Sequence, residues 1–188
     1  NGDYGSNKVK FGAYYGGSSK RNIKNVDLKN NRKNTWGTGL IFNHEIDSIQ
    51  NVTVAAGFTR QISENANKTA YYSNAYALGL AYNFVHTTYG LDLAHKDTKN
   101  KGGAGNKVKN NEVTAVIRQG LNEDWNVYAM YSYKTEKTLP AGSAYSKSTD
   151  RQFLVGTEYY VFKQGSVKVK PFIEWQATRT KYENTFDK

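Results

Sequence analysis

Aspartate and histidine can carry out acid–base chemistry together, and one such pair lies close in this sequence. Asp92 and His95 are three residues apart. Successive side chains of a strand point to opposite faces, so this odd spacing separates the two side chains if the segment is a strand. His44 and His86 lie beside expected short turns, away from this pair. Because no acid–base constellation assembles, we expect the protein not to be an enzyme.

Motifs for phosphate and metal chemistry are also weak. The glycine-rich residues 102–105 (GGAG) are followed by neither GK[ST] nor the start of a helix, so they do not form a phosphate-binding loop. The chain has no cysteine, which excludes thiol chemistry. We therefore expect no catalytic residue, no metal site and no cofactor.

The clearest structural pattern lies in residues 71–98. Large apolar residues occupy every second position in two runs: Tyr76, Leu78, Leu80, Tyr82 and Phe84, and then Tyr89, Leu91 and Leu93. A period of two predicts strands, and the short break between the runs predicts a hairpin. Each run covers about ten residues, which is longer than an ordinary strand and matches the roughly 9–11 residues that cross a bilayer. We interpret it as a hairpin of a transmembrane β-barrel, and a long hairpin in a soluble β-protein is the alternative.

The same alternation continues along the chain and predicts nine strands. Two of them form the hairpin above, and the others cover residues 8–16, 35–44, 50–61, 111–121, 125–134, 150–162 and 167–178. Long polar loops at residues 17–34, 63–69, 98–110 and 136–149, with another beginning after Thr178, alternate with short turns, as in bacterial outer-membrane barrels. The predicted fold class is therefore all-β, a transmembrane antiparallel up-and-down β-barrel.

The odd number of strands has a consequence for the domain. Single-chain bacterial barrels have an even number of strands, and an open edge would leave unpaired backbone groups in lipid. We therefore expect residues 1–188 to be one outer-membrane barrel domain that is incomplete, with a closing strand after Lys188.

Composition is consistent with a barrel. The mean hydropathy is −0.76 and no stretch of 18 apolar residues occurs, so no transmembrane helix is expected. In a barrel, half of the strand positions can be polar because they face a lumen. The net charge is +10, but the basic residues are spread over loops and alternate strand positions. A soluble basic β-protein that binds nucleic acid remains as an alternative.

If the large apolar rows face lipid, the alternate positions face the lumen. This parity predicts twelve charged pore-lining residues: Lys8, Lys10, Asp92, Lys96, Glu112, Arg118, Lys134, Glu136, Glu158, Lys168, Lys170 and Glu174. Seven of the twelve are basic, which predicts a weak preference for anions, with Arg118 and Lys134 as the first candidates for selectivity. The alternative is that opposite charges on neighbouring strands pair and keep the barrel rigid.

Three segments resemble a known family. They are YALGLAYNFVHTTYGLDLAHKDTKN (residues 76–100), NEVTAVIRQGLNEDWNVYAMYSYKTEK (residues 111–137) and DRQFLVGTEYYVFKQGSVKVKPFIEWQATRTKYE (residues 150–183). They resemble the C-terminal half of the general porins of Haemophilus and Pasteurella, which are trimers of sixteen-stranded barrels. The resemblance covers nearly the whole chain, which looks like strands seven to fifteen. The family's constricting loop precedes this part, and its closing strand with a C-terminal aromatic residue is not seen before Lys188.

The resemblance implies an integral protein of the Gram-negative outer membrane. Its function would be a water-filled channel for passive diffusion of small hydrophilic solutes and ions, and a homotrimer would be its assembly. Two alternatives are a smaller monomeric channel for acidic sugars and a non-channel barrel that acts as an adhesin or structural protein. The expected partners are outer-membrane lipid and lipopolysaccharide, whose phosphates basic loop residues can bind, and not nucleic acid.

Overall fold

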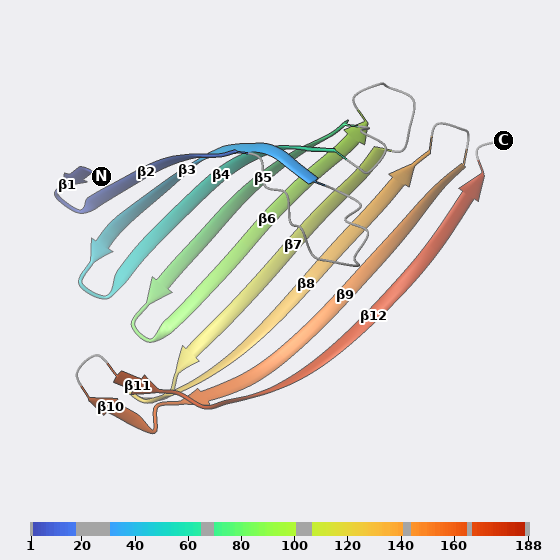
Figure 1. Cartoon of the computed structure of the whole chain (residues 1–188). Coiled ribbons are helices and arrows are strands. Elements are labelled where there is room, and N and C mark those ends of the chain that lie inside the picture. The colour runs from blue at the N-terminus through green and yellow to red at the C-terminus, as the bar shows by residue number, and fades with distance from the viewer. Residues whose placement is uncertain are drawn as a thin grey trace.

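The chain forms one long antiparallel sheet that bends into an open trough (Figure 1). The computed structural model describes residues 2–17, 31–64, 70–100, 107–140, 144–164 and 167–186. The strands are β1 (Gly2–Tyr4), β2 (Asn7–Gly16), β3 (Asn31–Asp47), β4 (Gln50–Glu64), β5 (Ala70–Phe84), β6 (Thr87–Asn100), β7 (Lys107–Gly120), β8 (Trp125–Leu139), β9 (Ala144–Tyr159), β10 (Phe162–Gln164), β11 (Val167–Val169) and β12 (Phe172–Phe186). Strands β1 to β9 and β12 form the main sheet in chain order, and β10 and β11 form a separate small hairpin. The predicted all-β, up-and-down antiparallel arrangement is confirmed, and nine of the main-sheet strands are long.

The described sheet is not closed into a barrel. Its edges are β1 at one side and β12 at the other, and the two do not pair. Strand β1 covers only residues Asn7, Lys8 and Val9 of β2, so the rest of that edge of β2 is also unpaired within the described residues. A sheet closes only when both edges find a hydrogen-bonding partner, and the described strands do not supply one.

Several strands are longer than predicted. Strand β8 runs to Leu139 and β9 begins at Ala144, although a loop was predicted over residues 136–149. Strand β12 runs to Phe186, where the sequence predicted a loop after Thr178. The apolar alternation marks only the part of each strand with large apolar side chains. Backbone pairing continues beyond it between polar residues, where hydropathy gives no signal.

The start of the last long strand was also predicted wrongly. It begins at Phe172, not at residue 167, because Val167–Val169 pair with Phe162–Gln164 as the β10–β11 hairpin. The ends of three further predicted loops also belong to strands: residues 31–34 lie in β3, 63–64 in β4, 98–100 in β6 and 107–110 in β7. The rest of these loops, at residues 18–30, 65–69 and 101–106, lies outside the described part of the chain.

Tight turns connect the strands at one end of the trough, here called the turn end; the opposite end is the loop end (Figure 1). In the β3–β4 turn, Asp47 Oδ1 accepts a hydrogen bond from the Ile49 N–H at 2.9 Å. In the β7–β8 turn, Asn122 Oδ1 accepts from the N–H groups of Asp124 at 2.9 Å and Trp125 at 2.8 Å. Asp and Asn side chains favour turns through such local bonds, so the sequence encodes these turns directly.

The strand register divides the sheet into two chemically different faces. Paired residues share a face, and successive residues of a strand alternate between faces. One continuous row of paired residues is entirely apolar: Val9, Phe42, Val54, Leu80, Leu91, Ala115, Tyr131, Phe153 and Ala177. The adjacent row is Lys10, Ile41, Ala55, Gly79, Asp92, Thr114, Ser132, Gln152 and Thr178. The faces that contain these rows are called the apolar face and the polar face.

The polar face lies on the inside of the curvature. Arg118 on β7 reaches Glu158 on β9, and Tyr128 on β8 reaches Glu174 on β12, each across an intervening strand. Neighbouring strands are about 4.8 Å apart, so next-but-one strands are about twice as far, and side chains meet across that gap most easily where they converge on a concave surface.

The large apolar residues do not form a core. No large hydrophobic residue among those described is buried, and the buried polar residues are Thr35, Ser132 and Thr149. The apolar face instead exposes its side chains: Leu80 is 41 % exposed and Phe153 is 44 % exposed. No helix in the described part of the chain is long and apolar enough to span a membrane.

Candidate functional site

The polar face carries a hollow along its N-terminal half, over β2 to β6. The hollow has a volume of about 770 Å³. Its lining includes small residues from five neighbouring strands together with two charged ones: Gly12, Gly39, Gly57, Ala77, Ala94, Lys10 and Asp92. Because the side chains here are short, the surface of this half of the sheet lies close to the backbone and leaves room above it.

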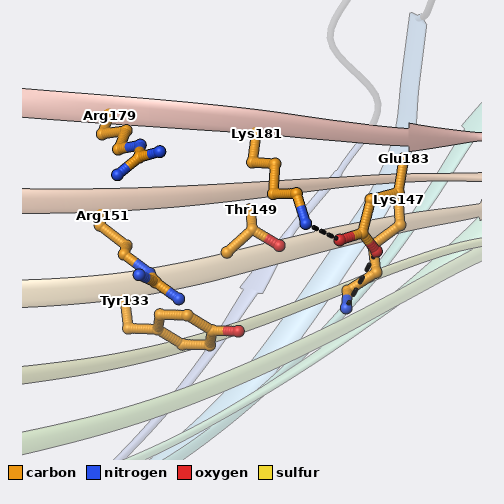
Figure 2. A pocket seen from close by; sticks show the side chains of 7 residues that line it. All are labelled: Tyr133, Lys147, Thr149, Arg151, Arg179, Lys181 and Glu183. Carbon is orange, nitrogen blue, oxygen red and sulfur yellow. Dashed lines mark ion pairs between the residues drawn. The ribbon is translucent and has the colours of Figure 1, made fainter.

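A second cavity, of about 380 Å³, lies on the apolar face toward the loop end of β8, β9 and β12 (Figure 2). Its lining is Tyr133, Lys147, Thr149, Arg151, Arg179, Lys181 and Glu183. Four of these side chains are basic and one is acidic. This polar patch begins one row beyond Phe153 and Ala177, where the wholly apolar row of this face ends its run on β9 and β12.

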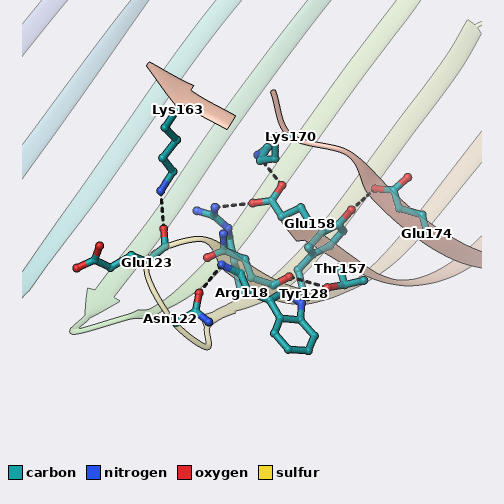
Figure 3. A network of polar contacts seen from close by, with 11 residues as sticks. Arg118, Asn122, Glu123, Tyr128, Thr157, Glu158, Lys163, Lys170 and Glu174 are labelled. Atoms are coloured by element: carbon teal, nitrogen blue, oxygen red, sulfur yellow. Dashed lines mark hydrogen bonds and ion pairs between the residues drawn. The ribbon is translucent and has the colours of Figure 1, made fainter. Parts of the chain in front are cut away.

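The C-terminal half of the polar face carries longer side chains, and several bond to one another at the turn end (Figure 3). The Glu158 carboxylate accepts from Arg118 Nη2 at 2.5 Å and from Lys170 Nζ at 2.5 Å. The Tyr128 hydroxyl donates to Glu174 Oε1 at 2.6 Å. The first contact links β7 to β9 and the last links β8 to β12, so together they stabilise the sheet across four strands.

A smaller set of hydrogen bonds lies nearer the middle of the same face. Thr114 Oγ1 donates to Ser132 Oγ at 3.1 Å, and Ser132 Oγ donates to Glu112 Oε1 at 3.4 Å. At the edge of the sheet, Lys8 Nζ donates to Glu45 Oε1 at 2.7 Å. Each of these contacts joins neighbouring strands.

Three lysines of the polar face have no ion-pair or hydrogen-bond partner among the described residues. They are Lys10, Lys96 and Lys134. Lys134 lies in register between Glu112 and Asp150, whose carboxylates offset part of its charge, whereas the strand partners of Lys10 and Lys96 are uncharged. The three ammonium groups are therefore not held in an ion pair within the described residues, in contrast to the guanidinium of Arg118.

The register places most of the predicted pore-lining residues together. Ten share the polar face: Lys8, Lys10, Asp92, Lys96, Glu112, Arg118, Lys134, Glu136, Glu158 and Glu174. Lys168 lies on β11, outside the main sheet. Lys170 follows β11 and reaches the face through Glu158.

Two acidic residues of the polar face were missed by the sequence reasoning. Glu45 pairs with Asn51, and Asp150 pairs with Lys134. Asp150 and Phe153 are three residues apart on β9, so they lie on opposite faces. Because Phe153 was predicted on the apolar face, the sequence was sufficient to place Asp150 on the polar face. Glu45 was missed because β3 extends beyond its predicted end at residue 44.

With these additions the described polar face has seven acidic and five basic residues on its rows, and Lys170 is a sixth basic group at its border. The predicted weak anion preference rested on a majority of basic residues among the charged ones. The described polar face does not have that majority. Anion preference stays a prediction without that support.

Asp92 and His95, the pair considered for acid–base chemistry, do not come together. Asp92 is on the polar face and His95 on the apolar face, as the odd spacing predicted. His95 contacts Asp97 at 3.2 Å and Asn111 at 2.7 Å, both on its own face. Among the described residues, no group of three metal-ligating side chains comes together.

No family model matches the chain, and neither a curated protein nor a solved structure shows significant similarity to it.

Proposed function

We propose that this protein is the wall of an outer-membrane β-barrel channel, through which small hydrophilic solutes and ions diffuse passively. The observation that carries the proposal is the inverted distribution of polarity. Large apolar side chains are exposed on the outside of the curve, no hydrophobic core is present among the described residues, and charged side chains line the inside. A soluble sheet of this size would bury its apolar face against another layer.

The proposal requires partners for both edges of the sheet. Unpaired backbone groups facing hydrocarbon cost several kcal/mol each, so β12 and the open part of β2 must pair with further strands in a membrane. Two further parts of the proposal come from the resemblance to general porins: a total of sixteen strands, and assembly of three barrels into a trimer.

Single-channel recording tests the proposal. The protein, reconstituted into planar bilayers of phosphatidylcholine, should give stable current steps whose size rises in proportion to salt concentration. A protein that inserts but conducts no ions would instead be a plugged, structural barrel. A protein that stays monodisperse in plain buffer and does not float with vesicles would contradict the membrane assignment.

Thiol labelling resolves the two faces, because the chain has no cysteine of its own. Thr114 and Ala115 are adjacent on β7 and lie on opposite faces. With Thr114→Cys, a bulky water-soluble methanethiosulfonate should react and reduce the conductance. With the matched control Ala115→Cys, the thiol should be shielded by lipid and the conductance unchanged. Equal labelling of both variants would contradict a lumen on the polar side.

Ion preference is measured separately, as a reversal potential in a salt gradient. The three lysines without partners have the clearest effect on it. Replacing Lys10, Lys96 and Lys134 by Gln should shift the permeability ratio toward cations, whereas Arg118→Gln should shift it less because that guanidinium is held in an ion pair with Glu158.

A further inference from the structure

The loop-end border of the apolar face is strongly basic. Three rows of this face beyond the wholly apolar row lie Arg60, Lys109, Lys137 and Lys147, and beyond these are Lys99 and Lys107. Arg151, Arg179 and Lys181 extend the same border toward the centre on β9 and β12. Only Asp97 and Glu183 oppose these nine cations among the described residues of that border.

The opposite border of the apolar face has a different composition. At the turn end the corresponding row is Gln50, Phe84, Thr87, Gln119, Val127, Thr157 and Ile173, with no basic residue. Leu121, Trp125 and Tyr159 follow it. The basic residues of this face are therefore concentrated at its loop-end border, which suits an anionic environment there.

The basic border is most concentrated in the cavity on β8, β9 and β12 (Figure 2). Arg151 and Arg179 are direct cross-strand partners, an arrangement in which like charges repel. Arg151 lies over the Tyr133 ring, with 5.9 Å between the guanidinium carbon and the ring centroid. Arg179 has no ion-pair or hydrogen-bond partner among the described residues. An anion bound between the two guanidinium groups would remove this repulsion.

The acidic residue of the cavity does not neutralise these arginines. Glu183 contacts Lys181 at 2.8 Å and Lys147 at 3.7 Å, and both contacts lie farther toward the loop end than Arg151 and Arg179. The arginine pair is therefore the uncompensated part of the cluster. Arginine is also the side chain best suited to bind phosphate oxygens in a bidentate manner.

The position of the cluster relative to the apolar surface selects the kind of anion. Two residues along the same strands from Arg151 and Arg179 lie Phe153 and Ala177, in the wholly apolar row. Two residues of a strand span about 7 Å, so the guanidinium groups stand directly above side chains that would contact acyl chains. A ligand that fits both is an amphiphile with a phosphorylated headgroup.

We propose that this cluster binds the phosphate group of a lipid in the leaflet at the loop end of the barrel. Arg151 and Arg179 hold the phosphate, Lys147 and Lys181 add positive charge, and the acyl chains lie along Phe153 and the apolar rows below. The inference rests on the proposed membrane function and deepens it, because it assigns a lipid chemistry and an orientation to one border of the wall.

The test uses the whole protein in phosphatidylcholine nanodiscs doped with a bisphosphorylated glucosamine lipid, the probe lipid. Retention of the probe lipid is measured by native mass spectrometry after release from the disc, against the same lipid without its phosphates. The variant is Arg151→Gln with Arg179→Gln. The control carries the same loss of charge on the polar face, as Lys10→Gln with Lys134→Gln.

We expect the arginine variant to bind the phosphorylated probe about tenfold more weakly or worse, as the loss of charge-assisted hydrogen bonds predicts, and the control to bind it like the unmodified protein. Equal retention of the dephosphorylated lipid, or equal losses in variant and control, would overturn the inference. So would displacement of the probe by inorganic phosphate at the same concentration, which would identify a soluble anion as the ligand.

The two proposals fail in distinguishable ways. If no form of the protein enters nanodiscs made of phosphatidylcholine alone, the membrane function fails and the lipid site fails with it. If all forms enter and none distinguishes phosphorylated from dephosphorylated lipid, the lipid site is wrong and the membrane function stands.

Discussion

Two tyrosines cross the polar face in the same way, each above a glycine of the intervening strand. Tyr14 on β2 passes over Gly37 to contact the hydroxyl of Thr59 on β4 at 2.7 Å. Tyr128 passes over Gly156 to donate to Glu174. A Cβ at Gly156 would lie 2.5 Å from Cζ of Tyr128, so any larger residue would displace the ring. The glycine is therefore part of the contact.

Gly156→Ala should lower the free energy of unfolding by about 1–2 kcal/mol, because the displaced Tyr128 ring loses its hydrogen bond to a carboxylate. In a Tyr128→Ala background the same substitution should cost little. The measurement is urea unfolding followed by the fluorescence of the three tryptophans. Gly12→Ala is the control, since nothing lies within 4 Å of its added Cβ. An equal cost in both backgrounds would show that the ring is not the cause.

Val85 is the one non-glycine residue in the described part of the chain with a positive φ, at 53°. It is the first residue of the two-residue β5–β6 turn, a position where glycine is favoured and a β-branched side chain is strained. Val85→Gly should raise the free energy of unfolding by about 1 kcal/mol in the same urea experiment. Leu121→Gly, in a turn residue without positive φ, should bring no gain. A loss of stability in Val85→Gly would contradict strain at this turn.

Within a single strand, neighbouring residues at the same height of the sheet lie on faces of different chemistry. Phe153 and Gln152 are neighbours on β9, and their side chains lie on the apolar and the polar face respectively. A strand in a barrel wall keeps one side in hydrocarbon and the other in water, so an introduced charge has opposite consequences on the two sides.

Phe153→Arg should therefore destabilise the protein in phosphatidylcholine vesicles by about 2–4 kcal/mol, the cost of Arg on a lipid face near the midplane. Gln152→Arg, one residue away, should have little effect. Both free energies come from urea titrations of vesicle-bound protein, monitored by tryptophan fluorescence. Similar costs for the two substitutions would mean that the faces are not exposed to different solvents.

Strand ends follow a different rule from strand centres. The apolar alternation ends where the strand leaves the rows of large side chains, but the hydrogen-bonded ladder continues, as between Ser148 on β9 and Tyr182 on β12. At the loop end these extensions place polar and basic residues, such as Lys147 and Lys181, at the border of the apolar face. Strand length thus exceeds the length of the apolar pattern, and the border cluster depends on that excess.

The described part of the chain is a curved sheet with two open edges. Interior strands such as β7 are hydrogen-bonded on both sides, whereas β12 is bonded only to β9. Stability against hydrogen exchange should therefore be lowest along the edges. The same edges are where a further strand would pair in a closed barrel.

Hydrogen exchange followed by mass spectrometry or NMR tests this arrangement. In the isolated chain in detergent, every second amide of β12 should exchange fast, because its N–H points away from β9. Amides of β7 should exchange slowly throughout. Uniform protection along β12 would show that another strand, from the same chain or a second copy, occupies this edge.

The sequence by itself determined the nine long strands, the two faces and the absence of an Asp92–His95 pair, because the period of two is a property of the local backbone and each side chain's parity can be counted along the chain. It also contained the parity of Arg151 and Arg179, which places both on the apolar face. Only the tertiary structure decided the register, the curvature and the open edges. Those depend on hydrogen bonds between residues far apart in the chain. They therefore decide that Arg118 and Glu158 form an ion pair, that Lys10 and Lys134 form none among the described residues, and that the two arginines are cross-strand partners.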